Sequence, residues 1–150
     1  MKKLCIFALA LMLSLPILLS AQTAASGDAI LGTWYNGEKS SKIVIVKTKS
    51  GAYQGYIDWL KTPLDETGKA KLDPKNPDKT LRSRPLMGMV VLTGLKSKGD
   101  NKFDGGKIYD PKSGNTYSCK GELKGANTLA LRGFIGVSLV GRTDTWTRAK

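Results

Sequence analysis

The feature that most constrains this chain is the regular alternation of short β-prone runs with turn residues from residue 31 onward. One run, Lys42 to Thr48 (KIVIVKT), is rich in β-branched side chains, which pack well in strands, and it ends at Ser50-Gly51. Strands spaced roughly 8–12 residues apart, with turns between them, are typical of a sandwich or barrel. We expect strands over residues 31–35, 42–48, 52–60, 87–95, 102–109, 116–123, 128–135 and 141–148.

The connections between these runs are mostly short, and this predicts the topology. Sequential strands joined by short turns pair antiparallel, in an up-and-down order. No segment after the N-terminal stretch has convincing helical periodicity. The sequence therefore predicts an all-β, antiparallel, closed barrel of eight to ten strands, formed by residues 31–150.

The N-terminal stretch has the pattern of a secretory signal peptide. Lys2 and Lys3 precede an apolar run that ends in the small residues Ser20 and Ala21. We expect cleavage after residue 21, a linker over residues 22–30, and an exported protein located in the periplasm or the medium. Pro16 and the short apolar run argue against a membrane-spanning helix, which needs about 20 apolar residues.

Composition excludes several kinds of site. The chain contains no His, and after cleavage the only remaining Cys is Cys119, so zinc sites and Ser-His or Cys-His catalysis are not expected. Cys119 alternates with apolar neighbours in a predicted strand, which indicates a buried thiol. We assign no metal, no cofactor and no catalytic residue.

The formal net charge of +12 falls to +10 when Lys2 and Lys3 are removed with the signal. A basic protein can bind nucleic acid, an anionic surface or an acidic ligand. Export argues against nucleic acid, and the lysines are scattered over turns, as expected for a solvated surface. An anionic envelope surface remains a candidate partner, and the sequence predicts no oligomeric state.

One connection, residues 61–85, is too long for a meander of tight turns and contains four prolines. Long connections in compact domains are usually functional or mobile. We expect an ordered loop over one barrel mouth. Arg82 and Arg84 flank Ser83, so both guanidinium groups leave the same face of an extended segment. They are candidates either for binding an anion or for ion pairs with Asp73 or Asp78 that fasten the loop.

Residues near the two ends of the predicted barrel indicate how it closes. The first strand opens with Gly32 and Trp34, and the last contains Trp146 and Arg148. Since the first and last strands of a closed barrel are neighbours, we expect Arg148 to lie across the Trp34 indole as a cation–π pair.

Four motif blocks stand out along the chain: GYIDWL (residues 55–60), DPKNPDKTLRSRPLMG (73–88), GGKIYDPKSGNTY (105–117) and LRGFIGVSLVGRTDTWTR (131–148). Together they resemble the DUF2147 family of exported bacterial proteins. Gly-x-Trp and the C-terminal Arg also look like a signature of lipocalins. The resemblance implies a lipocalin-like barrel and no particular activity.

We expect the barrel mouth to bind a small amphipathic or anionic molecule. Candidate ligand-binding residues are Arg82, Arg84, Arg132, Tyr109 and Trp59, and candidate apolar walls are Ile43, Ile45, Tyr56, Trp59, Ile108 and Phe134. The alternatives are a non-enzymatic envelope interaction module with a filled core and, least favoured, a hydrolase or isomerase using Asp and Tyr. An open cavity would favour the first interpretation over the second.

Overall fold

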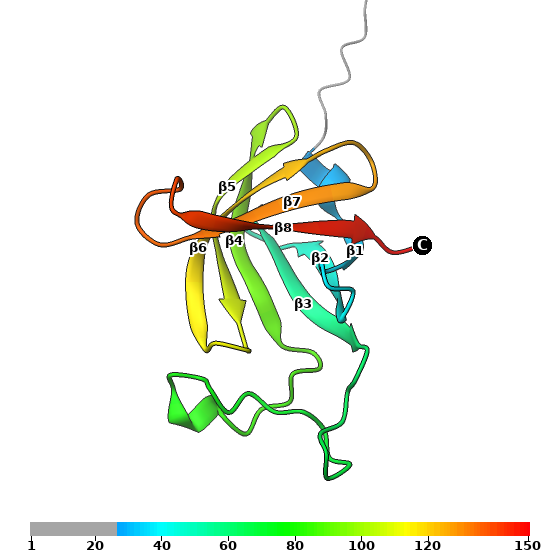
Figure 1. Ribbon diagram of the computed structural model, residues 1–150. Coiled ribbons are helices and arrows are strands. Elements are labelled where there is room, and N and C mark those ends of the chain that lie inside the picture. Colours follow the sequence, from blue (N-terminus) through cyan, green and yellow to red (C-terminus); the bar gives the residue numbers. More distant parts are fainter. Residues whose placement is uncertain (1–26) are drawn as a thin grey trace, which may run out of the picture.

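The computed structural model describes residues 27–150, which form a single closed antiparallel barrel (Figure 1). The expected signal peptide at residues 1–21 lies outside the described residues. No helix within residues 27–150 is long and apolar enough to cross a membrane. The strands are β1 (Gly32–Tyr35), β2 (Ser41–Lys47), β3 (Tyr53–Leu60), β4 (Val90–Gly99), β5 (Lys102–Asp110), β6 (Asn115–Leu123), β7 (Thr128–Phe134) and β8 (Gly141–Arg148).

Each strand pairs with the next in the sequence, and β8 pairs with β1 to close the sheet. The closing register places Trp34 opposite Arg148 and Tyr35 opposite Thr147. The all-β, up-and-down, closed barrel predicted from the sequence is therefore confirmed, with eight strands in the described part of the chain.

The largest difference from the predicted strands is in β4, which runs from Val90 to Gly99 and not over residues 87–95. Met87 and Gly88 instead belong to a turn, in which Gly88 donates to the Ile57 carbonyl and has a φ of 77°. A positive φ is easily adopted by glycine and strained for other residues. Because of this turn, β4 begins at Val90 and not at residue 87.

One end of the barrel is closed by η1 (Gly27–Ile30), a 3-10 helix in a segment that the sequence analysis assigned to a linker. Ile30 is fully buried, and its carbonyl accepts a hydrogen bond of 2.9 Å from Trp34 Nε1. The last residues of the expected linker are thus part of the hydrophobic core. We call the end of the barrel that η1 covers the closed end.

The opposite end, the mouth end, carries the turns at residues 36–40, 111–114 and 135–140, and the long connection after β3. Figure 1 shows this connection extending below the barrel, with η2 (Lys79–Leu81) at its far side. Its backbone is organised by isolated bridges between Leu64 and Ala70 and between Leu72 and Pro85. Two of its polar side chains are buried, Asp73 and Asn76.

Candidate functional site

A cavity of about 630 Å³ lies inside the barrel and opens at the mouth end. Ligand pockets in proteins typically have volumes of about 300–1,000 Å³ and mostly apolar linings. The mouth half of the barrel interior is therefore open, whereas core side chains such as Trp34, Leu92 and Leu95 fill the half at the closed end. Apolar lining residues from six strands form the deeper part of the cavity: Ile43, Ile57, Val91, Ile108, Leu131 and Trp146.

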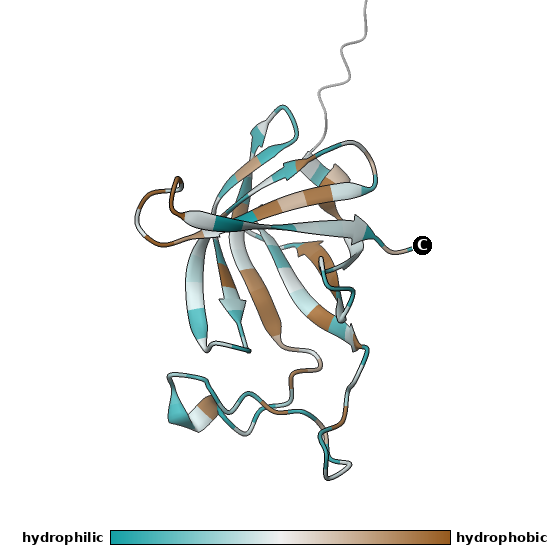
Figure 2. Ribbon diagram, in the orientation of Figure 1, coloured by the Kyte–Doolittle hydropathy of each residue, from teal (hydrophilic) through white to brown (hydrophobic). Residues whose placement is uncertain are grey.

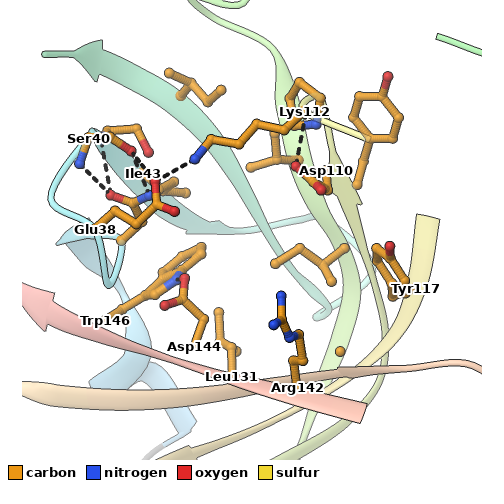
Figure 3. A pocket seen from close by; sticks show the side chains of 18 of the residues that line it. Glu38, Ser40, Ile43, Asp110, Lys112, Tyr117, Leu131, Arg142, Asp144 and Trp146 are labelled. Carbon is orange, nitrogen blue, oxygen red and sulfur yellow. Dashed lines mark hydrogen bonds and ion pairs between the residues drawn. The ribbon is translucent and has the colours of Figure 1, made fainter. Parts of the chain in front are cut away.

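The direction of Trp146 decides which face of β8 lines the cavity. Its indole is buried, with 2% exposed, so the alternating residues Arg142 and Asp144 also face the interior. Figure 3 shows the side chains of Arg142, Asp144 and Trp146 directed into the same space. Along β8, the cavity-facing side chains therefore change from the apolar indole of Trp146 in the interior to the charged groups of Asp144 and Arg142 at the mouth.

A salt bridge between Lys112 and Glu38 spans the mouth (Figure 3). Glu38 lies in the β1–β2 turn and Lys112 in the β5–β6 turn, and these hairpins are not neighbours in the sheet. The hydrogen bond from Lys112 holds the pKa of Glu38 below its usual value. Both side chains are largely exposed, so the pair contributes little to stability and is open to competition by salt or ligand.

The other two carboxylates around the cavity also have donors. Asp144 accepts a hydrogen bond of 2.7 Å from Trp146 Nε1. Asp110 accepts from Ser113 Oγ at 2.7 Å and from the Lys112 amide at 3.0 Å. The negative groups at the mouth are therefore already stabilised by the protein.

Arg142 differs from all of these groups. Within residues 27–150, no hydrogen bond or ion pair is formed by its guanidinium group, which points into the cavity (Figure 3). The lining has two cationic and three acidic side chains, so its overall charge does not attract anions. Any preference for an anion must come from the local fork of N–H donors on Arg142, which matches carboxylate or phosphate oxygens.

Of the five ligand-binding candidates from the sequence, only Tyr109 lines the cavity. Arg84 instead donates through Nε and Nη2 to Asp73 at 3.1 and 3.0 Å, and Arg82 donates through Nε to the Asn76 carbonyl at 2.8 Å. Both arginines thus have partners inside the long loop, but only Arg84 forms an ion pair of the kind expected, with Asp73, whereas Arg82 binds a backbone carbonyl.

Asp73 is the centre of this loop attachment. It is fully buried and also accepts from Tyr109 Oη at 2.7 Å and from Asn76 Nδ2 at 2.7 Å. Burial raises the pKa of Asp73, but the hydrogen bonds from Tyr109, Asn76 and Arg84 outweigh it and leave the pKa below its usual value. Burial and the Asp73 carboxylate raise the pKa of Tyr109 to about 12. These contacts fasten the loop to β5 beside the cavity.

Trp59 points to the outside of the barrel, although strict alternation along β3 would place it on one face with Tyr53 and Ile57. The β2–β3 register shifts between Lys42 and Ile43, and this irregularity reverses the alternation after Ile57. Trp59 consequently packs edge-on against Tyr35, with ring centroids 6.0 Å apart. Of the proposed apolar walls, Ile43 and Ile108 line the cavity, whereas Ile45, Tyr56, Trp59 and Phe134 do not.

Arg132 also lies outside the cavity. It donates to the Ser138 and Leu139 carbonyls at 2.7 and 3.0 Å and to Thr143 Oγ1 at 3.1 Å. Its guanidinium group therefore supports the β7–β8 turn.

The expected contact at the closed end is present. The Arg148 guanidinium carbon lies 4.1 Å from the centroid of the Trp34 indole. Arg148 also donates to the carbonyls of Leu31, Ala29 and Ala126, at 2.8, 2.6 and 2.8 Å. It joins η1, β1 and the β6–β7 turn, and its Nη1 approaches residue 32, where a φ of 114° favours glycine. Trp146, the other closure candidate, lies in the core and lines the cavity.

Sequence reasoning missed Arg142 and Lys112 as site residues. Period-two alternation puts Arg142, Asp144 and Trp146 on one face of the last strand, but it does not show which face is internal. Pairing Lys112 with Glu38 depends on the spacing of two distant turns, which no local pattern encodes. Among the described residues, no group of three or more Cys, Asp and Glu side chains could hold a metal ion.

The fold and the cavity define a lipocalin-like barrel. A similar solved structure is a protein from Helicobacter pylori described as belonging to the lipocalin family. It is 27% identical, the match covers 80% of this chain and 82% of that one, and the TM-score is 0.70. No curated protein matches the sequence significantly.

A family model described as "Uncharacterized protein conserved in bacteria (DUF2147)" matches residues 32–148. The chain belongs to this family, as the motif blocks indicated.

Proposed function

We propose that this protein is an exported carrier that binds a small amphipathic molecule with an acidic head group inside the barrel. The observation that carries the proposal is an open cavity of about 630 Å³ with an apolar interior and one unpartnered guanidinium group, Arg142, at its mouth. The lipocalin-like fold supports a binding role, because barrels of about eight strands have room for one small ligand.

The chemistry of the mouth favours an acid over a neutral head group. Each acidic side chain there already has a donor, so a ligand gains most by satisfying Arg142. Arg142 is exposed in the free protein, so a charge-assisted hydrogen bond to it contributes about 1.5–3 kcal/mol only when the bound ligand excludes water from the mouth. The apolar tail gains about 0.8 kcal/mol per buried methylene group. Lys112 can provide a second cation if the ligand displaces Glu38.

Titrations with dodecanoate and with dodecanol test the proposal. Arg142→Gln should weaken dodecanoate binding by about tenfold or more and leave dodecanol binding unchanged. Gly133 lines the cavity, and a Cβ there would make ordinary contacts at 3.5 Å with Ile108 and Tyr117. Gly133→Leu should therefore fold, fill part of the cavity and weaken both ligands.

The matched control is Arg82→Gln combined with Arg84→Gln. If the loop arginines bind the head group, as one interpretation of the sequence proposes, this double variant loses dodecanoate selectivity and Arg142→Gln keeps it. We expect the reverse. If wild-type protein binds neither ligand, or if Gly133→Leu binds both normally, the cavity is not the site.

A further inference from the structure

The β7–β8 turn, residues 135–140, differs from the other short turns of the barrel. The turns at residues 36–40, 100–101, 111–114 and 124–127 are dominated by Asn, Asp, Lys, Ser and Gly, whereas this one reads IGVSLV. Its four large aliphatic side chains are exposed: Ile135 71%, Val137 63%, Leu139 88% and Val140 71%. Figures 1 and 2 show it as an apolar loop projecting from the side of the barrel.

Isolated exposed apolar residues are common, but a contiguous group usually marks an interaction surface. The turn projects from the barrel because hydrogen bonds from Arg132 and Lys120 fix its backbone and the Ser138 side chain. Lys120 Nζ donates to Ser138 Oγ at 3.0 Å, and Arg132 donates to the Ser138 and Leu139 carbonyls.

These hydrogen bonds satisfy backbone carbonyls of the turn, which makes it easier to bury the turn away from water. The Val137 carbonyl also has a donor, the Val140 amide at 3.1 Å. Three consecutive carbonyls of the turn are thus satisfied from within the protein. An unsatisfied carbonyl is costly away from water, so this arrangement removes one barrier to burying the turn in an apolar medium.

Charge identifies the partner. The same side of the barrel has a hollow bordered by the basic residues Lys98, Lys102, Lys120, Lys124 and Arg132, with the acidic residues Asp104 and Glu122. Glu122 is already paired with Lys124. An apolar tip beside a basic surface fits the interface of an anionic bilayer, where aliphatic groups enter the acyl region and cations meet the head groups.

We propose that residues 135–140 dock this protein onto an anionic lipid bilayer, with the basic outer face of β4–β7 against the head groups. Gly133 and Arg142, which flank the turn in the sequence, line the cavity, so the docking turn lies next to the barrel mouth. The inference goes beyond ligand binding and does not depend on it.

Flotation with vesicles tests the proposal. The protein should bind vesicles of phosphatidylglycerol and phosphatidylcholine, bind phosphatidylcholine alone at least about tenfold more weakly, and dissociate at high salt. Leu139→Asp should reduce binding by at least about tenfold. The matched control is Leu64→Asp, at a leucine in the long loop that is 49% exposed, and it should bind like wild type.

Thermal melting should show both variants folded, since each side chain is substantially exposed. The proposal is overturned if wild type does not float, if Leu139→Asp floats normally, or if both variants lose binding equally. It is also overturned if sedimentation shows a wild-type dimer that Leu139→Asp dissociates while vesicles are not bound. In that case the turn is a surface for a second copy of the chain.

Discussion

Arg148→Met removes the group that joins the two ends of the sheet, and its cost can be worked out from the contacts. The guanidinium lies over the fully buried face of Trp34, a contact worth about 1–2 kcal/mol. The part-buried hydrogen bond to the Leu31 carbonyl adds about 1–1.5 kcal/mol, while the carbonyls of Ala29 and Ala126 are exposed and can bind water. We therefore expect a loss of about 3 kcal/mol.

For a domain of this size, about 3 kcal/mol corresponds to a fall in Tm of roughly 10 °C, measurable by circular dichroism or calorimetry. Arg148→Lys keeps the positive charge but loses the planar guanidinium group with its several N–H donors, so its Tm should lie between those of Arg148→Met and wild type. The matched control is Arg142→Met, which removes a guanidinium without partners in the described structure and should leave Tm nearly unchanged. If Arg148→Met melts within about 1 °C of wild type, the closure does not stabilise the barrel.

Two further predictions concern titrating groups. Cys119 is 1% exposed and burial raises its pKa to about 12, so a thiol reagent at pH 8 should label native protein slowly and denatured protein at once; equal rates would contradict the burial. Because the folded-state pKa of Asp73 is lowered, its contribution to stability is complete above the unfolded pKa, about 3.9, and is lost as the pH falls through the folded value. Limited proteolysis should therefore show the loop released only in strong acid in wild type, and already at neutral pH in Arg84→Gln. A loop equally resistant in both proteins would show that the Asp73 contacts do not hold it.

The fold was predictable because its signals are local. Runs such as residues 42–48 carry their own strand preference, and the separating turns carry Gly, Asn and Asp at the positions where the chain reverses. Even the contact between Trp34 and Arg148 followed, since closure makes the first and last strands neighbours.

The site was less predictable, because it depends on register and on distances between remote turns. The irregularity near Ile57 turned Trp59 outward, and period-two alternation alone could not reveal it. Asp73 and Asp78 were both named as possible partners of Arg82 and Arg84, but a loop without periodicity did not show that Asp73 is buried and binds only Arg84 of the two. Arg142 became a candidate only once Trp146 was seen to point inward.

The most direct test of cavity binding is a crystal structure of the protein soaked or grown with 12-bromododecanoate. If the ligand binds in the cavity, we expect anomalous bromine density in its deep apolar part, near Ile57 and Leu131. The carboxylate should lie within hydrogen-bond distance of Arg142. An empty cavity at a saturating ligand concentration, or bromine found only on the outer face, would contradict it.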